Sequence, residues 1–433
     1  MPSWMPNRTR LARGAAPLGL ALALMPGEAR GELWAAAGKI DITPAGPCWI
    51  AGYAPNRRSE GVHDPVWARA LVLREGGERL ALVSCDVIGL NFGVIQRIRS
   101  AVKAVPGERV IVGSTHTHSG PDTQGLWGPN PATSGVDKAW LSDVIRRIAA
   151  LVDETAARLK PATIAFGSVS GVKDCSYNAR VAAILDTELA ALRVVGTDGA
   201  GIATLVNYAC HPEVLNCRQV TSDFPHWLRS RLEERLGGVA LYFNGAQGGM
   251  VTAVIQNEDR HPEGQAWPEA ERVGLTLADA ALRALDGARP ASVAPIQFAR
   301  REFAVPLENS RFKALLASGV LDGALTREGR ILTEVARFTV GPAEFITLPG
   351  EVLPSIGLYL KRHMTGRPRF QLGLTGDALG YILTPEDYGL ELYRYETSMS
   401  VGSQMGRIME DHLLALMAAD RPAAAGRQES GRP

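Results

Sequence analysis

The chain has 433 residues, of which 46% are hydrophobic and 21% charged, as is typical of soluble globular proteins rather than disordered or fibrous ones. Its 46 Lys and Arg residues nearly balance 45 Asp and Glu, giving a formal net charge of +1. No basic patch interleaved with aromatic residues is visible, so we exclude nucleic acid as a partner. The length fits one large α/β domain or two ordinary ones.

The N-terminus has the features of an export signal. Arg8, Arg10 and Arg13 precede an apolar run at 14–25, and Ala29-Arg30-Gly31 supplies a small-x-small cleavage pattern. This order predicts a secretory signal peptide over residues 1–31 and an exported protein, periplasmic or secreted. A disordered extension or a start codon placed too early is the alternative. The run is shorter than the roughly 20 residues that a bilayer span needs, and we expect no transmembrane segment.

The remaining chain alternates between strand and helix patterns, which predicts an α/β fold: a layered, mixed β-sheet core flanked by helices, in one large domain over residues 32–417. After Pro290 the strand signals become denser, so a smaller subregion could begin there. Residues 418–433 are mostly Ala, Gly, Arg and Pro and are expected to be a disordered tail. Strands are predicted at 39–43, 68–73, 80–85, 109–113, 163–166, 189–195, 202–209, 239–243, 296–303, 333–340 and 344–348, and helices at 94–102, 138–159, 269–285, 352–363 and 399–416.

The five cysteines are an odd number in a large exported chain and do not describe a disulfide scaffold. Cys210 and Cys217 could pair. Cys210 lies within an apolar run, however, and fits equally well as a small core residue.

Two of the eight histidines, His116 and His118, form an HxH pair directly after the strand predicted at 109–113. On extended backbone, residues two apart project to the same side, so both imidazoles could reach one centre. Neutral imidazole is the commonest protein metal ligand. A bare HxH pair is more often a hydrogen-bonded turn, and further ligands must converge before it holds a metal.

Other candidate residues are weak one by one. His211 follows a strand, and Glu351 lies between a strand and the next helix, where it could instead be a carboxylate facing the helix dipole. Tyr381 would ordinarily be a packed aromatic. The glycines of the segment 244–249 permit a tight turn, but neither a phosphate-binding loop nor a GxSxG serine elbow is present.

Taken together, these segments resemble the neutral/alkaline, non-lysosomal ceramidase family. The matching pieces occur in the family's order over about residues 36–415: Asp41-Ile42-Thr43-Pro44, Gly61-Val62-His63-Asp64-Pro65, Thr115-His116-Thr117-His118-Ser119-Gly120-Pro121, His211 with Ser222-Asp223, Pro349-Gly350-Glu351, and Gly380-Tyr381-Ile382 with Tyr395-Glu396.

The resemblance implies a zinc ion held by His116, His211, Glu351 and Tyr381. It places His118 beside the scissile amide, together with Tyr395, for which Tyr393 is a competitor, and with an active-site arginine that matches Arg180. The implied reaction is hydrolysis of the amide bond of an N-acyl compound, such as a ceramide, by a metal-activated water. The implied partner is therefore a small N-acyl or lipid-like substrate.

Two departures from the family limit what the resemblance implies. Gly249 and Met250 stand where the family has an active-site serine and a proline, and we expect a short form without the C-terminal immunoglobulin-like domain of full-length ceramidases. Two alternatives therefore stay open. One is a zinc hydrolase of an ester, lactone or small amide, and the other is a non-catalytic exported binding protein on the same scaffold.

Overall fold

The structure is a computed structural model that describes residues 31–249, 252–253 and 263–419. The predicted signal peptide, apart from Gly31, and the expected tail from residue 420 onward lie outside the described residues. No helix in the described part of the chain is long and apolar enough to cross a bilayer.

The larger of two main β-sheets has eight strands in the order β11-β9-β8-β6-β1-β3-β4-β5. Its pairs are antiparallel except β4–β5 and β9–β11, which are parallel, so the sheet is mixed as predicted. The strands are β1 (Leu33–Asp41), β3 (Trp67–Glu75), β4 (Glu78–Cys85), β5 (Val110–Ser114), β6 (Lys160–Val169), β8 (Leu189–Gly196), β9 (Gly201–Tyr208) and β11 (Val239–Asn244).

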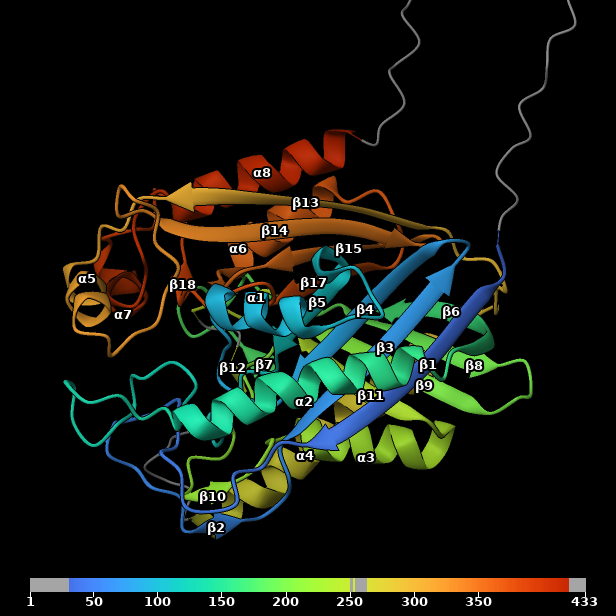
Figure 1. The fold of residues 1–433 in the computed structure, drawn as a ribbon, viewed down its shortest axis with the longest axis horizontal. Coiled ribbons are helices and arrows are strands. Elements are labelled where there is room, and N and C mark those ends of the chain that lie inside the picture. Colours follow the sequence, from blue (N-terminus) through green and yellow to red (C-terminus); the bar gives the residue numbers. More distant parts are fainter. Residues whose placement is uncertain (1–30, 250–251, 254–262, 420–433) are drawn as a thin grey trace, which may run out of the picture.

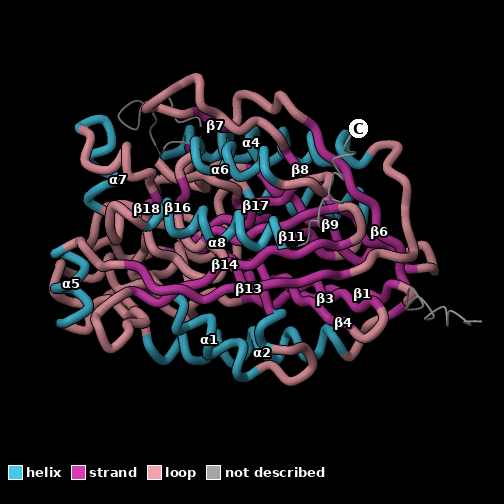
Figure 2. Tube along the Cα trace, turned by 90° about the horizontal axis from the view of Figure 1, so that it is seen from above, coloured by secondary structure: helices cyan, strands magenta, loops and turns pink. Residues whose placement is uncertain are grey.

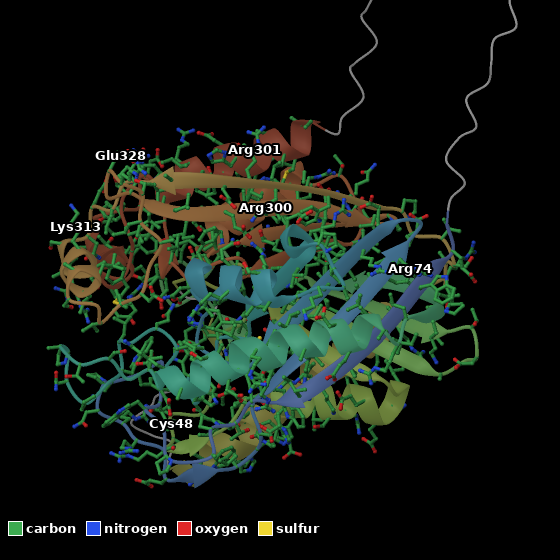
Figure 3. The ribbon with its side chains drawn as sticks, viewed as in Figure 1. Cys48, Arg74, Arg300, Arg301, Lys313 and Glu328 are labelled. Carbon is green, nitrogen blue, oxygen red and sulfur yellow. The ribbon has the colours of Figure 1, made fainter. Side chains whose placement is uncertain are left out.

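The second main sheet has four strands in the order β13-β14-β15-β17, with only β15–β17 parallel. These are β13 (Ile296–Val305), β14 (Ile331–Val340), β15 (Ala343–Leu348) and β17 (Arg369–Gly373). The edge strand β13 carries charged side chains, including Arg300 and Arg301 (Figure 3), which discourage pairing with another strand.

The two sheets face each other and share one core, as Figures 1 and 2 show. Leu71 and Leu73 of β3 pack into the same apolar cluster as Phe338 of β14 and Phe345 of β15. The alternate residues of β3, such as Val72, face the helices α1 and α2 on the other side. The strand-rich stretch after Pro290 is therefore not a separate subregion, because it covers one face of the first sheet.

Helices cover both outer faces and complete a layered α/β fold. On the eight-stranded sheet lie α1 (Phe92–Ala101), α2 (Lys138–Ala156), α3 (Pro225–Leu236) and α4 (Glu263–Leu285). On the four-stranded sheet lie α6 (Pro354–His363) and α8 (Met405–Ala419), of which α8 is seen above β13 and β14 in Figure 1. The short helices α5 (Ser310–Ala317) and α7 (Arg394–Ser398) lie with β18 (Tyr381–Ile382) at one end of the molecule, on the left of Figure 1.

Several sequence predictions need correction. The last helix begins at Met405 rather than Met399, and the helix predicted from Val352 begins at Pro354. The helices α3 and α5 and the strand β17 were not predicted. Cys210 and Cys217 do not form a disulfide. Both are free thiols and pack as small core residues under α3 and α4.

Three parallel strand pairs set the position of the candidate site. Along the chain, α1 lies between β4 and β5, α3 between β9 and β11, and α6 between β15 and β17. Each parallel pair with its helix is therefore a β-α-β unit. The segments 115–118, 211–213 and 245–249 follow β5, β9 and β11, and Glu351 follows β15. Ligands bind beyond the carboxyl ends of the strands in such folds, which explains why these distant segments meet.

Candidate active site

The HxH segment leaves the sheet at the end of β5 through a strained turn. The Thr115 amide donates to the Cys85 carbonyl at 2.8 Å and the His116 amide to the Val87 carbonyl at 3.1 Å. His116 has a φ of 74°, in the left-handed region that few residues other than glycine adopt. The expectation of extended backbone here is therefore wrong, and a kink rather than strand geometry brings the two imidazoles together.

His116, His211 and Glu351 direct their side chains at one point. His116 Nδ1 lies 2.6 Å from the Ile88 carbonyl oxygen and donates to it, so Nε2 is the ring nitrogen that faces Glu351 and could bind a metal. His116 Nε2 is 3.4 Å, and His211 Nε2 3.0 Å, from Glu351 Oε2. Ligands about 2.0–2.2 Å from a tetrahedral ion lie roughly 3.3–3.6 Å apart, so this spacing suits one metal ion.

Tyr381 reaches the same point through a short strand pairing. Residues Glu351–Val352 form β16, which pairs in parallel with β18, so that Glu351 stands opposite Tyr381. The Glu351 amide also donates to the Gly380 carbonyl at 2.8 Å. Both side chains are buried, and the backbone pairing fixes the spacing between carboxylate and phenol.

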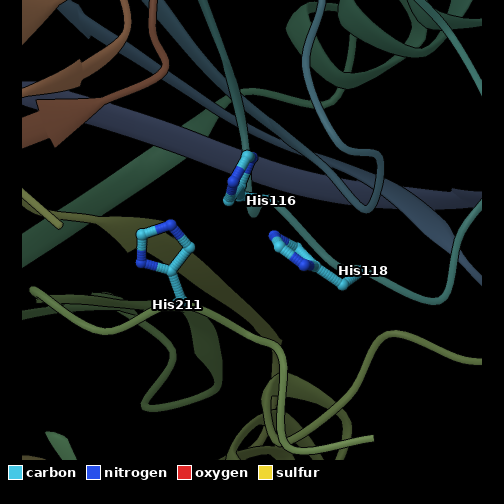
Figure 4. Close-up of side chains that lie close together, drawn as sticks. All are labelled: His116, His118 and His211. Atoms are coloured by element: carbon cyan, nitrogen blue, oxygen red, sulfur yellow. The ribbon is translucent and has the colours of Figure 1, made fainter. Parts of the chain in front are cut away.

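His118 completes a buried group of three imidazoles (Figure 4). One ring nitrogen of each of His116, His118 and His211 lies within 4.8 Å of the others. Among the described residues, neither nitrogen of His118 has a hydrogen-bond partner. Its nearest charged neighbour is Glu213, with 3.6 Å between Nδ1 and Oε2. Three imidazoles and a carboxylate could thus hold a metal in two ways, either with His118 as a ligand or with His118 beside the ion.

The protonation of these groups follows from their burial and mutual charge. Burial lowers the pKa of His118 well below its ordinary value, and the adjacent His116 and His211 lower it further. Burial alone would raise the pKa of Glu351, but the two histidines beside it bring that pKa below its usual range. Burial and then the charge of Glu351 raise the pKa of Tyr381, and the same causes raise that of Tyr395 to about 12. At neutral pH His118 is therefore neutral, Glu351 is ionised, and the phenols of Tyr381 and Tyr395 are protonated.

The residues beside the metal-ligand candidates are less tightly grouped. Tyr395 packs edge-on against Tyr381 with 5.6 Å between ring centroids, whereas Tyr393 is buried in a small apolar cluster. Arg180 does not line the pocket that contains the histidines. Its Nε lies 3.2 Å from Oε1 of the buried Glu396, the neighbour of Tyr395. The structure thus brings Tyr395 to the site and leaves Arg180 at its margin.

An apolar pocket opens from these groups towards α5. His116, His118, Glu351, Tyr381 and Tyr395 form its polar end. The rest is mainly hydrophobic, with Trp127, Leu307, Phe312, Leu316, Leu332 and Met399 among its lining residues. Glu213 and Gly52 lie next to His118, and Gly52 packs directly against the His118 side chain. Neither these two residues nor the apolar residues of the pocket have a local sequence pattern that would predict a site.

The loop after β11 passes directly behind Glu351. The Gly248 amide donates to the Val352 carbonyl at 2.8 Å, so Gly248 approaches β16 closely. Gly249 has a φ of 58°, and a Cβ atom there would lie 2.3 Å from Leu353 Cδ2. The side chain of Leu353 thus fills the space that a side chain at position 249 would need. Met250 lies outside the described residues.

We therefore predict that Gly249→Ser lowers the free energy of unfolding more than the same change at a glycine with equal φ but open surroundings. Gly76 is the matched control, because its φ is 56° and nothing lies within 4 Å of the point that a Cβ atom would occupy there. Left-handed backbone costs both variants about 1–2 kcal/mol. Overpacking against Leu353 should cost Gly249→Ser a further 1–3 kcal/mol or so in urea denaturation. Equal losses in the two variants would contradict this packing argument.

Comparisons with known proteins agree with the fold and the motifs. Residues 35–224 match the family described as neutral/alkaline non-lysosomal ceramidase, N-terminal. The neutral ceramidase of Pseudomonas aeruginosa is 31% identical over 142 residues, which are 30% of this chain and only 21% of that protein.

Solved structures extend the likeness to most of the chain. A crystal structure of neutral ceramidase from Pseudomonas aeruginosa superposes with a TM-score of 0.75, at 18% identity, over 90% of this chain and 74% of that one. A ceramidase complexed with C2 gives a TM-score of 0.74, also at 18% identity, over 90% and 75% of the two chains. Residues 35–224 therefore match the neutral/alkaline non-lysosomal ceramidase family, and the chain has the fold seen in neutral ceramidase structures.

Proposed function

We propose that this protein is a zinc-dependent hydrolase that cleaves the amide bond of an N-acyl compound of the ceramide type. The observation that carries this proposal is the approach of His116 Nε2 and His211 Nε2 to Glu351 Oε2, at 3.4 and 3.0 Å, where His116 and Glu351 line the polar end of an apolar pocket. The match of residues 35–224 to a ceramidase family supports the choice of bond.

The donor set fits zinc. Two imidazole nitrogens, one carboxylate oxygen and a neighbouring phenol are the nitrogen and oxygen ligands that zinc accepts. The hydrogen bond from His116 Nδ1 to the Ile88 carbonyl fixes the tautomer that a ligand needs. A zinc ion held there would acidify water and polarise a carbonyl oxygen at neutral pH.

The neighbouring side chains can carry the proton and the developing charge. His118 is buried, neutral and without a hydrogen-bond partner in the described part of the chain, so its ring can accept a proton and pass it to a leaving amine. The hydroxyl of Tyr395 stays protonated because its pKa is raised to about 12, and it can donate a hydrogen bond to an oxyanion.

The shape of the pocket favours a substrate with an apolar tail. Leu307, Phe312, Leu316 and Met399 offer an apolar surface within the same pocket as the histidines. Burial of methylene groups contributes about 0.8 kcal/mol for each CH₂, so a long acyl chain should bind far more tightly than a short one.

We expect the purified protein to contain about one zinc per chain, and turnover to stop on chelation and return with added zinc. The zinc content can be measured by elemental analysis. The loss and recovery of activity can be followed with an N-acyl sphingosine. Absence of stoichiometric zinc would overturn the proposal.

A substrate panel identifies the bond. Long- and short-chain N-acyl sphingosines are compared with short esters, lactones and amides under the same conditions. We expect the long-chain amide to have the highest kcat/KM. A preference for esters or lactones would keep the metal and replace the proposed reaction. Lack of turnover by a zinc-loaded protein would favour a binding role.

A further inference from the structure

We infer that the side-chain amide of Asn244 is a positioning group that sets the distance between the two metal-ligating histidines. This inference rests on the proposed function, because it assumes that His116 and His211 hold one metal ion. Asn244 is the last residue of β11, is fully buried and touches neither histidine ring in any hydrogen bond of the described structure.

The amide joins the peptides that precede the two histidines. Its Nδ2 donates to the carbonyl of Thr115, next to His116, at 3.1 Å. Its Oδ1 accepts from the backbone amide of Cys210, next to His211, at 3.0 Å. One planar group of fixed size therefore spans two loops that are nearly 100 residues apart in sequence.

The other hydrogen bonds found between the two loops in the described part of the chain lie on the far side of the histidines. The His118 amide donates to the Pro212 carbonyl at 3.0 Å, and the Thr117 hydroxyl donates to the Thr221 carbonyl at 2.9 Å. Each histidine is thus held by one cross-link before it and by others after it. Loss of the Asn244 cross-link would release the backbone that precedes each histidine, where the turn at His116 is already strained.

The orientation of Asn244 is itself fixed. Its Oδ1 also lies 3.2 Å from the amide nitrogen of Gly245, which can donate to it. The oxygen must therefore face Cys210 and the nitrogen Thr115, and the residue cannot flip without losing these bonds. Groups that orient metal ligands typically change metal affinity by about 10–100-fold when they are replaced.

Asn207 is a matched control. It is a buried asparagine on the neighbouring strand β9, and its Nδ2 lies within 3.0 Å of the carbonyl oxygens of Phe243, Asn244 and Gln371. Its replacement should cost similar stability through lost buried hydrogen bonds. None of these bonds reaches a peptide next to a metal-ligating histidine.

The test measures zinc affinity by competition with a chromophoric chelator in the wild type, Asn244→Ala, Asn244→Ser and Asn207→Ala. We expect a 10–100-fold weaker zinc Kd for both Asn244 variants and less than a threefold change for Asn207→Ala. The visible absorption of the Co²⁺-loaded proteins should change for the Asn244 variants alone, because it reports ligand geometry. Urea denaturation of the metal-free proteins separates the loss of folding from the loss of positioning.

The outcomes distinguish the inference from the proposed function. If the wild type binds no zinc, the proposed function fails and the inference fails with it. If the wild type binds zinc and the Asn244 variants bind it equally well, or if Asn207→Ala weakens binding as much, only the inference is overturned. If Asn244→Ala does not fold, Asn244→Ser decides, because its shorter hydroxyl can bond to one peptide but cannot span both.

Discussion

Replacement of Glu351 by glutamine is expected to abolish stoichiometric zinc binding and to lower turnover by at least about 10³-fold. Among the four proposed ligands His116, His211, Glu351 and Tyr381, the anion is Glu351, with its Oε2 3.0 Å from His211 Nε2 and 3.4 Å from His116 Nε2. Glutamine keeps the size of the side chain but removes the charge that a divalent cation needs. Changes to groups behind a metal ligand already cost about 10–100-fold in affinity, and loss of a ligand should cost more.

His118→Ala is the counterpart that decides between the two ways of holding a metal. If His118 stands beside the ion, this variant should keep zinc within a few-fold while its turnover falls by about 10²–10⁴-fold, the range for loss of a general acid or base. Zinc content and kcat are measured on the same preparations of both variants. Zinc retained by Glu351→Gln and lost by His118→Ala would show instead that the three histidines are the ligands.

The order of strands and helices could be predicted from the sequence because most elements carry a regular apolar pattern. The helix α2 has buried Leu141, Ile145 and Ile148 at helical spacing, and the structure places it at Lys138–Ala156. The helix α3 has only a narrow apolar row, Leu228, Leu232 and Leu236. The rest of it is mostly polar, and one of its few buried side chains is Arg229, whose partner Asp86 lies in the loop after β4. Helices of this kind depend on tertiary contacts that a local pattern does not contain.

The packing of one sheet on the other could not be predicted from the sequence, because it depends on which face of each strand turns inward. In β14 both faces are apolar: Phe338 packs between the sheets, whereas Val335 packs under α8. A strand buried on both faces has no polar alternation to orient it. The sequence therefore predicted one domain but left open a smaller subregion after Pro290.

Some residues of the candidate site could also be predicted from the sequence, and others could not. The strand-end positions of His116 and His211 followed from the predicted strands, because strand ends gather at one edge of such a sheet. The meeting of Glu351 with Tyr381 depends on a two-residue parallel pairing, which has no period to detect. Asn244 and Glu213 contact other loops rather than their own neighbours, so only the folded chain reveals them.

The second large effect is expected in stability, at the ion pair beneath the HxH segment. Arg229 donates two hydrogen bonds to Asp86, at 2.7 and 2.8 Å, and both side chains are almost completely buried. Asp86 also lies 2.9 Å from the Trp67 amide and 3.2 Å from the Thr115 hydroxyl, both of which can donate to it. This carboxylate therefore supports the residue next to His116.

Arg229→Leu should lower the free energy of unfolding by about 3–5 kcal/mol, because it leaves the Asp86 carboxylate buried without its countercharge. The double variant Asp86→Leu with Arg229→Leu should recover part of that loss, since replacing both partners by apolar groups removes the unpaired charge. The exposed pair Lys160–Asp198 is the control, and Lys160→Met should cost no more than about 1 kcal/mol. Urea denaturation of the metal-free proteins measures all three. If Arg229→Leu lowers the free energy of unfolding by less than about 1 kcal/mol, water must reach Asp86. The HxH segment would then be supported by the backbone hydrogen bonds of Thr115 and His116 alone.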